Sequence, residues 1–439
     1  MRTPILDFVR RYEESGALRL HMPGHKGRGP LGVEGKDITE VRGADSLYEA
    51  EGVIRQSEEN ASSLFGCSTW YATEGSSQCI RAMVYLAMLR AKEEGKEPLI
   101  AAGRNAHKTF LSAVALLDVQ VQWLMGQQGS YLSCSLKPED LEEVFSRPEK
   151  PTAVYITSPD YLGNVADIAA LAAVCHRHDA LLLVDNAHGA YLRFLRPSLH
   201  PVDLGADLCC DSAHKTLPVL TGGAYLHTGG GFGEIAVRNA LALFGSTSPS
   251  YLILQSLDAA NPYLEGHWKR MEAFLPAVNH VKESLSRMGY TLVGEEPLKI
   301  TIAAKPYGYK GEKLADLLRR QNIECEFADP DYLVLMITPE IGEEGLRRIA
   351  EVLENIVPGP ALKEPMPAFR ECTQVLTPRE AILAPAESVP VEKAVGRILA
   401  APSVGCPPAV PIVLSGQRIH EETVAAFRYY GIDRVTVIK

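Results

Sequence analysis

Long hydrophobic runs are missing from this sequence: no apolar stretch approaches the roughly 20 residues that a membrane-spanning helix needs. The first eleven residues include three arginines and one aspartate, and are too charged for a secretory signal peptide. Internal repeats and long low-complexity stretches are also missing. We therefore expect a globular cytoplasmic protein that has no membrane partner.

Positive charge and paired cysteines are also scarce. The 44 Lys and Arg residues are outnumbered by 54 Asp and Glu, a formal net charge of −10, which argues against nucleic acid as a main partner. The nine cysteines are odd in number and include no Cys-x-x-Cys pair, so free thiols in a reducing cytoplasm explain them better than disulfides. Cys175, His176 and His178 lack an acidic third ligand, and we expect no metal site.

Alternating short apolar runs and helical patterns occupy residues 70–227. This alternation predicts an α/β fold with a mostly parallel sheet covered by helices on both faces. Further along, apolar runs at 299–304 and 332–337, with helical patterns at 311–320 and 342–355, predict a smaller α+β unit. A helix over 262–288 is expected to lead into it.

Residues 207–218 carry the first chemical signal. A short apolar run ends at Cys210, and a polar turn then presents Ser212, His214 and Lys215. An amine at a strand end, beside a hydroxyl and an imidazole, can be desolvated, which lowers its pKa and makes it a nucleophile toward an aldehyde. The alternative is a solvated charge, as for most lysines in loops.

The second signal lies thirty residues upstream, where a buried apolar run over 180–184 ends in Asp185. An acid at the carboxyl end of a parallel strand lies where open α/β sheets bind ligands. Pyridoxal phosphate (PLP) needs a lysine for its Schiff base and a carboxylate that keeps its pyridine nitrogen protonated. Lys215 and Asp185 together therefore favour a PLP enzyme.

A phosphate site is predicted where a strand at 70–73 runs into Glu74-Gly75-Ser76-Ser77-Gln78 and an apolar helix at 79–90. Backbone amides at a helix N-terminus, with the hydroxyls of Ser76 and Ser77, suit a dianion. Simple helix capping by serine is the alternative.

Four motifs closely resemble those of the bacterial ornithine/lysine/arginine decarboxylases, which are fold-type-I PLP enzymes. They are residues 21–27 (His-Met-Pro-Gly-His-Lys-Gly), 184–190 (Val-Asp-Asn-Ala-His-Gly-Ala), 212–218 (Ser-Ala-His-Lys-Thr-Leu-Pro) and 246–251 (Ser-Thr-Ser-Pro-Ser-Tyr). The resemblance runs along nearly the whole chain. It is to the shorter members, which lack the N-terminal wing domain.

This resemblance implies decarboxylation of arginine, lysine or ornithine to the corresponding amine and CO2, with PLP as cofactor. Lys215 would hold PLP as a Schiff base, and Asp185 would pair with the pyridine nitrogen. His107 would stack on the pyridine ring, and His188 would lie near the phenolic oxygen of the cofactor.

The same resemblance implies further cofactor contacts and a dimer. The remaining residues expected at the cofactor are Ser76, Ser77, Ala187, Ser212, His214 and Thr247. His214 would contact phosphate or assist proton transfer. Thr247 would reach the PLP phosphate of the neighbouring subunit, so that the two chains of a homodimer share their active sites. Assembly beyond the dimer is left open. Helix capping by Ser248 or Ser250 is the other explanation of this loop.

Four domains are expected. They are an N-terminal helix (4–15) and arm over 1–30, a PLP-binding large domain over 31–261, a small α+β domain over 262–358, and a C-terminal decarboxylase-type domain over 368–439. The C-terminal domain contains the Cys-Pro-Pro-Ala-Val-Pro segment at 406–411.

Four positions depart from the pattern of the resembled family: Glu74, Asp160, Asn186 and Gly222. Relatives usually have Asn at the first and Gln at the last. A carboxylate is unfavourable near a phosphate, so we expect Glu74 to point away. These departures keep two alternatives open: another PLP-dependent aminotransferase or lyase on the same fold, and a non-catalytic, regulatory PLP-binding homologue.

Overall fold

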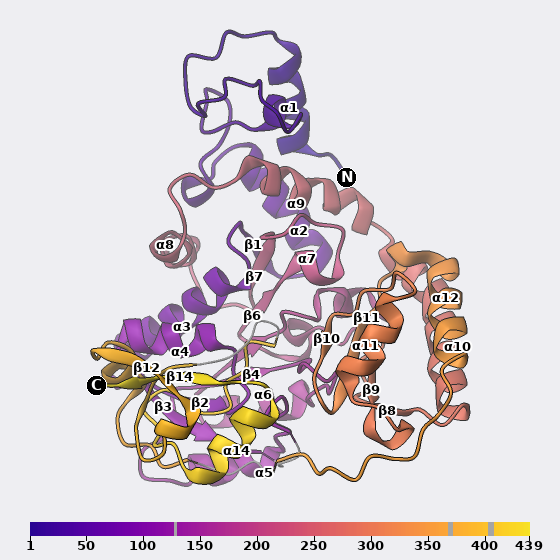
Figure 1. The fold of residues 1–439 in the computed structure, drawn as a ribbon. Coiled ribbons are helices and arrows are strands. Elements are labelled where there is room, and N and C mark those ends of the chain that lie inside the picture. Colours follow the sequence, from indigo (N-terminus) through magenta and orange to yellow (C-terminus); the bar gives the residue numbers. More distant parts are fainter. Residues whose placement is uncertain (127–129, 368–371, 403–407) are drawn as a thin grey trace. The chain divides into compact units, whose positions relative to one another are not determined.

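The computed structural model describes residues 1–126, 130–367, 372–402 and 408–439 (Figure 1). The chain divides into two units, each interrupted in sequence. The first unit comprises residues 1–94 and 181–269, and the second comprises 95–180 and 270–439. No helix in the described ranges is long and apolar enough to span a bilayer.

Four strands of the first unit lie in the order β1-β7-β6-β5. They are β1 (Ser68–Ala72), β5 (Leu181–Asp185), β6 (Leu208–Asp211) and β7 (Ala224–Thr228). β5 and β6 are parallel, with Asp185 opposite Cys210. β7 is antiparallel to both β6 and β1.

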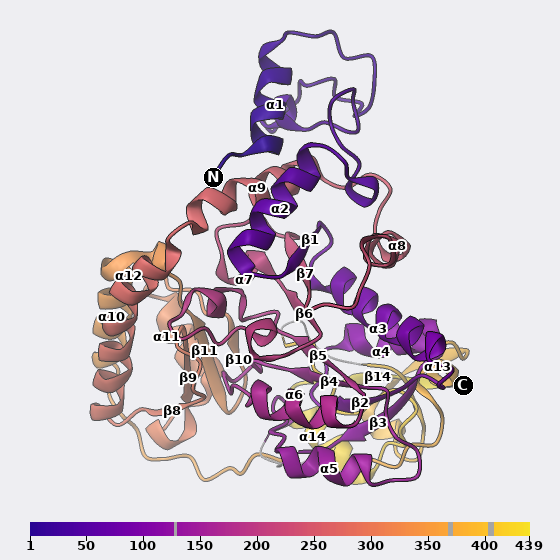
Figure 2. The same cartoon turned by 180° about the vertical axis from the view of Figure 1, so that it is seen from behind.

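Helices cover these strands and carry the N-terminal segment. They are α1 (Pro4–Glu14), α2 (Val53–Phe65), α3 (Ser76–Glu93), α7 (Ala213–Thr216), α8 (Glu234–Phe244) and α9 (Tyr251–Leu264). Both views show α1 beyond α2 and α9, on the side away from the strands (Figures 1 and 2). The backbone N–H of Leu6 anchors α1 by donating to Asp258 Oδ2 of α9 at 2.9 Å.

The second unit begins with three strands in the order β3-β2-β4, all parallel. Its elements alternate: β2 (Leu99–Gly103), α4 (Lys108–Leu117), β3 (Gln120–Leu124), α5 (Pro138–Phe145), β4 (Ala153–Thr157) and α6 (Ile168–Arg177). The expected alternation and the mostly parallel pairing are confirmed. β2 and β4 are mostly apolar and buried, whereas β3, at the end of this strand order, carries two glutamines and is only partly buried.

A four-stranded antiparallel sheet follows, in the order β10-β11-β9-β8. Its region contains α10 (His267–Arg287), β8 (Thr291–Val293), β9 (Lys299–Ala303), α11 (Gly311–Arg319), β10 (Phe327–Ala328), β11 (Tyr332–Met336) and α12 (Gly342–Glu354). The helix predicted over 262–288 is confirmed over most of its length as α10, but residues 262–264 belong to α9. α9 ends at Leu264, and Gly266 adopts a left-handed conformation (φ +75°) that ends the turn before α10 begins.

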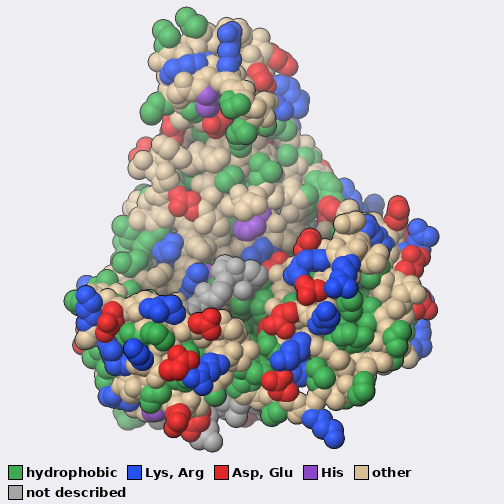
Figure 3. Space-filling model, in the orientation of Figure 1, with side chains coloured by type: hydrophobic (Ala, Val, Ile, Leu, Met, Phe, Trp, Pro, Cys, Tyr) green, Lys and Arg blue, Asp and Glu red, His purple; other side chains and the backbone are tan. Residues whose placement is uncertain are grey.

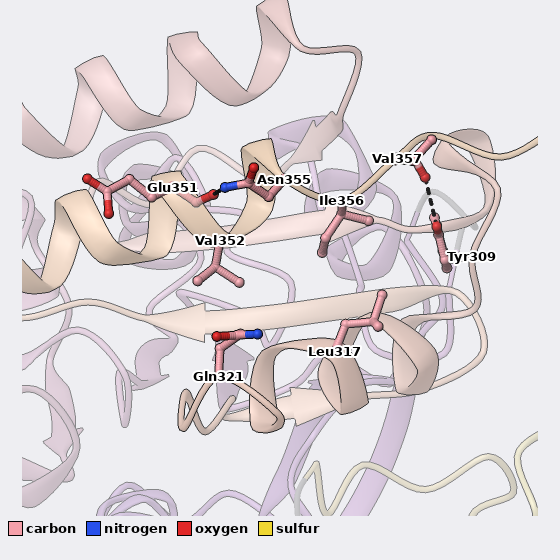
Figure 4. A pocket seen from close by; sticks show the side chains of 8 residues that line it. All are labelled: Tyr309, Leu317, Gln321, Glu351, Val352, Asn355, Ile356 and Val357. Carbon is pink, nitrogen blue, oxygen red and sulfur yellow. Dashed lines mark hydrogen bonds between the residues drawn. The ribbon is translucent and has the colours of Figure 1, made fainter.

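A groove of about 590 Å³ lies between α11 and α12 (Figure 4). Leu317, Val352 and Ile356 give it apolar walls, and the hydroxyl of Tyr309 donates to the carbonyl of Val357 at 2.7 Å near one end. Its lining residues include no lysine, histidine or serine. The groove therefore offers none of the chemistry that PLP requires.

The chain ends in a three-stranded antiparallel sheet, β12-β14-β13. This part contains α13 (Pro378–Ile382), β12 (Ala386–Pro390), β13 (Leu399–Ala401), α14 (Glu421–Tyr429) and β14 (Arg434–Ile438). Arg379 Nη1 of α13 donates to the carbonyl of Ala115, in the last turn of α4, at 2.8 Å. The expected first residue of a C-terminal domain, 368, and Cys406-Pro407 lie outside the described residues. The four domain boundaries remain predictions.

Candidate active site

The carboxyl ends of β5 and β6 bring Asp185 beside the Ser212–Lys215 segment. Asp185 is only 2% exposed, and its Oδ1 accepts the backbone N–H of Ala187 at 3.2 Å. The Cys210 thiol lies 3.6 Å from the same oxygen. A parallel pair of strands thus presents a buried carboxylate on one strand and the lysine-bearing segment on its neighbour.

The expected polar turn after β6 is in fact a single helical turn, α7, because Lys215 N–H and Leu217 N–H bond to the carbonyls of Ser212 and Ala213 at 3.0 and 2.8 Å. Lys215 is half-buried on this turn. His214 Nδ1 donates to the carbonyl of Gly223 at 3.0 Å, and burial lowers the pKa of this imidazole. A neutral ring whose Nδ1 carries the proton has Nε2 as its acceptor nitrogen.

Hydroxyls gather where α3 begins. Ser76 and Ser77 are the first two residues of this helix, and Ser212 Oγ donates to Ser76 Oγ at 2.8 Å. The first N–H groups of an α-helix have no partner within the helix and point outward together. Amides and hydroxyls converge here without an intervening side chain from Gly75, so the donor set fits the phosphate of PLP.

The departure at Gly222 has a structural reason. Gly222 adopts φ +99°, and a Cβ there would lie 2.8 Å from the carbonyl oxygen of Thr73. Its own carbonyl accepts the N–H of Gly75 at 2.8 Å. A residue with a side chain would be strained at this φ and would collide with Thr73, the residue after β1, so glycine holds the turn that leads into α3.

Glu74, which departs from the family pattern, connects two loops. Glu74 is exposed, and its Oε1 accepts the backbone N–H of Ser246 at 2.5 Å. The carboxylate therefore engages the loop that carries Thr247, and Thr247 itself is exposed. Whether Glu74 points away from a bound phosphate stays a prediction.

Asp211 is a site residue that sequence reasoning missed. Its Oδ2 lies 3.0 Å from both His200 Nε2 and His227 Nε2, and its Oδ1 accepts the side-chain amide of Asn186 at 2.7 Å. All four side chains are fully buried. Burial alone would raise the pKa of the Asp211 carboxyl, but the two imidazoles outweigh it and hold that pKa well below its usual range.

The Asp211 cluster joins the two strand ends that present the chemistry. Asn186 directly follows Asp185, and Asp211 directly precedes Ser212, so their hydrogen bond ties these two positions together. This accounts for the departure at Asn186. His200, Cys209 and Asp211 could also approach a metal ion, with ligand atoms within 4.8 Å of one another. The hydrogen bonds from both imidazoles already satisfy Asp211 Oδ2.

The remaining predicted residues have clear local positions. His188 is buried in the loop after β5. In the second unit, His107 caps α4, its Nδ1 accepting the N–H of Thr109 at 3.1 Å. Asp160, another residue that departs from the family pattern, stabilises a turn, since its Oδ1 accepts the N–H groups of Leu162 and Asn164, both at 2.9 Å. The stacking of His107 on PLP remains a prediction.

Comparison with known proteins identifies the family. Residues 32–292 match the model of the Orn/Lys/Arg decarboxylase major domain, and residues 366–434 match that of the C-terminal domain. The chain belongs to the Orn/Lys/Arg decarboxylase family. The expected family is thus confirmed: the protein is an amino-acid decarboxylase, and PLP is its cofactor.

Individual relatives cover nearly the whole chain. The arginine decarboxylase of Bacillus subtilis is 26% identical over 96% of this chain and 92% of its own length. The uncharacterized protein YaaO of the same organism is 28% identical over 97% of this chain and 93% of its own length. The Francisella novicida lysine decarboxylase LdcF superimposes with a TM-score of 0.82 at 16% identity, covering 100% of this chain and 81% of that one. The constitutive lysine decarboxylase of E. coli gives 0.79 at 17% identity, covering 100% and 82%. The predicted fold-type-I architecture is confirmed.

Proposed function

We propose that this enzyme removes the α-carboxylate of arginine, lysine or ornithine, releasing CO2 and the corresponding amine. The observation that carries the proposal is the pair of adjacent parallel strands that present Asp185 and the Lys215 turn beside the Ser76–Ser212 hydroxyl pair. Arginine is the first substrate to test, because curated relatives along the whole chain are named arginine decarboxylase.

When bound, PLP supplies an electron sink for the electrons left when CO2 departs. Lys215 attaches the cofactor through its amine. The Asp185 carboxylate holds a proton on the pyridine nitrogen, and its burial strengthens this attraction because few water molecules screen it. Ala187 orients the carboxylate through its N–H.

The phosphate is held by the N-terminus of α3 and by the hydroxyls of Ser76, Ser77 and Ser212. His214 carries its ring proton on Nδ1, so its Nε2 can accept a proton, and only after that protonation can Nε2 donate to a phosphate oxygen. His188 is assigned to the phenolic oxygen of the cofactor and His107 to its ring face. Both assignments follow the family resemblance.

A substrate panel tests the reaction itself. The purified PLP-loaded enzyme is incubated with arginine, lysine, ornithine and, as a neutral control, norleucine, and CO2, amine and keto acid are quantified. We expect one basic amino acid to give CO2 and amine in equal amounts, with no keto acid. Keto acid accumulation would favour an aminotransferase, and a yellow protein without turnover would favour a regulatory PLP-binding protein.

The active enzyme is proposed to be a homodimer. Leu18, Leu20, Met22 and Leu31, on the segment after α1, are 68–84% exposed. Hydrophobic side chains are visible on the surface of this N-terminal segment (Figure 3). A second copy of the chain would remove this apolar surface from water. Thr247 is exposed on the loop whose Ser246 N–H donates to Glu74, and we propose that it contributes to the partner's site.

Replacing Thr247 with valine is expected to weaken PLP binding by roughly 1–3 kcal/mol, because a hydroxyl that bonds to a charged group is removed while the side-chain shape is kept. PLP titration measures this, and Ser248→Ala, a neighbouring exposed hydroxyl, is the control.

Mixing two defective variants tests directly whether each active site is built by two subunits. A Lys215→Ala chain combined with a Thr247→Val chain forms heterodimers with one intact site, so activity at limiting PLP should exceed that of either parent. A monomer in sedimentation that retains PLP would rule out the shared site.

A further inference from the structure

A second cavity, of about 190 Å³, lies in the second unit beside β10, and the segment before α14 and the one after it contribute to its wall. Its apolar lining is supplied mainly by Phe327, Pro330, Val410, Ile412 and Ile432. Its polar lining consists of two acids and two phenols: Asp329, Glu312, Tyr131 and Tyr430. No lysine or arginine is among the lining residues, so this cavity is acidic and apolar at once.

Asp329 is a buried carboxylate with one unsatisfied oxygen. The residue is 6% exposed, and its Oδ1 accepts the N–H groups of Asp331 and Tyr332 at 2.8 and 2.7 Å. Its Oδ2 has no hydrogen-bond partner among the described residues. Burial raises the pKa of Asp329 to about 7. A buried carboxylate oxygen without a donor is costly, and a cationic ligand would remove that cost.

The carboxylate of the nearby residue Asp331, in contrast, has a partner on each of its two oxygens. Its Oδ1 lies 2.8 Å from Lys305 Nζ and accepts the Tyr429 hydroxyl at 2.8 Å, while its Oδ2 accepts the Tyr430 hydroxyl at 3.3 Å. The nearby cation is therefore already engaged by Asp331. In the part of the chain that the structure describes, Asp329 has no such counter-ion.

Aromatic rings complete the chemistry of the cavity. The rings of Tyr131 and Tyr430 pack edge to face, with their centroids 4.7 Å apart. Ring faces attract ammonium and guanidinium groups. At about 30 Å³ per water, the volume equals roughly six water molecules, which a short alkyl chain with one charged end can replace.

We propose that this cavity binds an organic cation: an ammonium or guanidinium group on a short aliphatic chain, with the charge on Asp329 and the chain on the apolar wall. One wall of the cavity is joined by a hydrogen bond to the chain beside His107, a residue predicted to contact the cofactor. Lys108, which follows His107, donates its N–H to the carbonyl of Ala409 at 3.0 Å. If the proposed function holds, the cation is the distal group of the substrate or the amine product.

Calorimetric titration of the full-length, PLP-loaded enzyme at pH 8, above the pKa of Asp329, tests the site. The probe is n-butylguanidine, which has no primary amine to react with PLP, and 1-pentanol is the neutral comparison. We expect saturable binding of butylguanidine, clearly tighter than of pentanol, and a loss of affinity of at least about tenfold in Asp329→Asn. Asparagine keeps the oxygen that accepts the N–H groups of Asp331 and Tyr332.

Asp316→Asn is the matched control, since this exposed carboxylate on α11 pairs with Arg319 and does not line the cavity. Equal melting temperatures of the variants show that the fold is kept. Butylguanidine affinity that is unchanged in Asp329→Asn overturns the proposal, as does the lack of saturable binding up to about 10 mM.

Kinetics separates the two sources of the cation. If the cavity receives the substrate's distal group, Asp329→Asn raises KM for the basic amino acid at least about tenfold, and butylguanidine competes with substrate. If it receives free amine, KM is unchanged and the amine lowers kcat in the wild type only. Should no basic amino acid be decarboxylated, calorimetry still decides the cation site, so the two proposals fail independently.

Discussion

Replacing Lys215 with alanine is expected to abolish both decarboxylation and covalent retention of PLP. Lys215 lies on the one-turn helix that follows β6, three residues after Ser212, whose hydroxyl bonds to Ser76 at the start of α3. The Lys215 amine follows, by three residues in the chain, a serine that bonds to the predicted phosphate site, so it is the group expected to attach the cofactor. No other residue of the turn carries an amine.

The measurement is reduction with borohydride followed by mass spectrometry of the protein and of its peptides. The wild type should carry one reduced PLP on the peptide containing Lys215, and the Lys215→Ala variant none. Lys310→Ala, at an exposed lysine paired with Glu364, should keep the label and is the control. A label that persists on another lysine of the Lys215→Ala variant would overturn the assignment.

Replacing Asp185 with asparagine is expected to lower kcat by at least about 100-fold, the scale on which one well-placed electrostatic contact acts. The carboxylate is nearly inaccessible at the end of β5, so its attraction for a protonated pyridine nitrogen is weakly screened. The amide can still accept the N–H of Ala187, so the loop should keep its conformation. PLP should therefore remain bound while turnover falls.

Asp207→Asn is the matched control for Asp185. Asp207 immediately precedes β6, at the end of the strand opposite to Ser212, and its Oδ2 accepts the N–H of Leu182 at 2.8 Å. This substitution should lower the melting temperature without reducing kcat comparably. Near-normal turnover of Asp185→Asn, measured at saturating PLP, would show that Asp185 does not support the pyridine nitrogen.

The sequence by itself determined the fold class and the order of the strands and helices around the site. β5, β6 and β7 were predictable because short apolar runs that end in polar turns are local patterns. The Gly-Ser-Ser turn before α3 and the Lys215 turn after β6 could be found in the same way. The helix α8, over Glu234–Phe244, was not predicted, and a polar turn was expected where the helical turn α7 lies.

The tertiary structure alone decided how the site is supported. Asp211 meets Asn186 and His227 because β5, β6 and β7 are neighbours in that register, and the connection between β5 and β6 adds His200. No spacing along the chain indicates these contacts. The need for glycine at position 222 likewise depends on the carbonyl of Thr73, about 150 residues away in the chain. Chemical groups within one turn can be predicted from sequence, because the chain connects them directly. Hydrogen bonds between distant segments depend on packing, which only the folded chain defines.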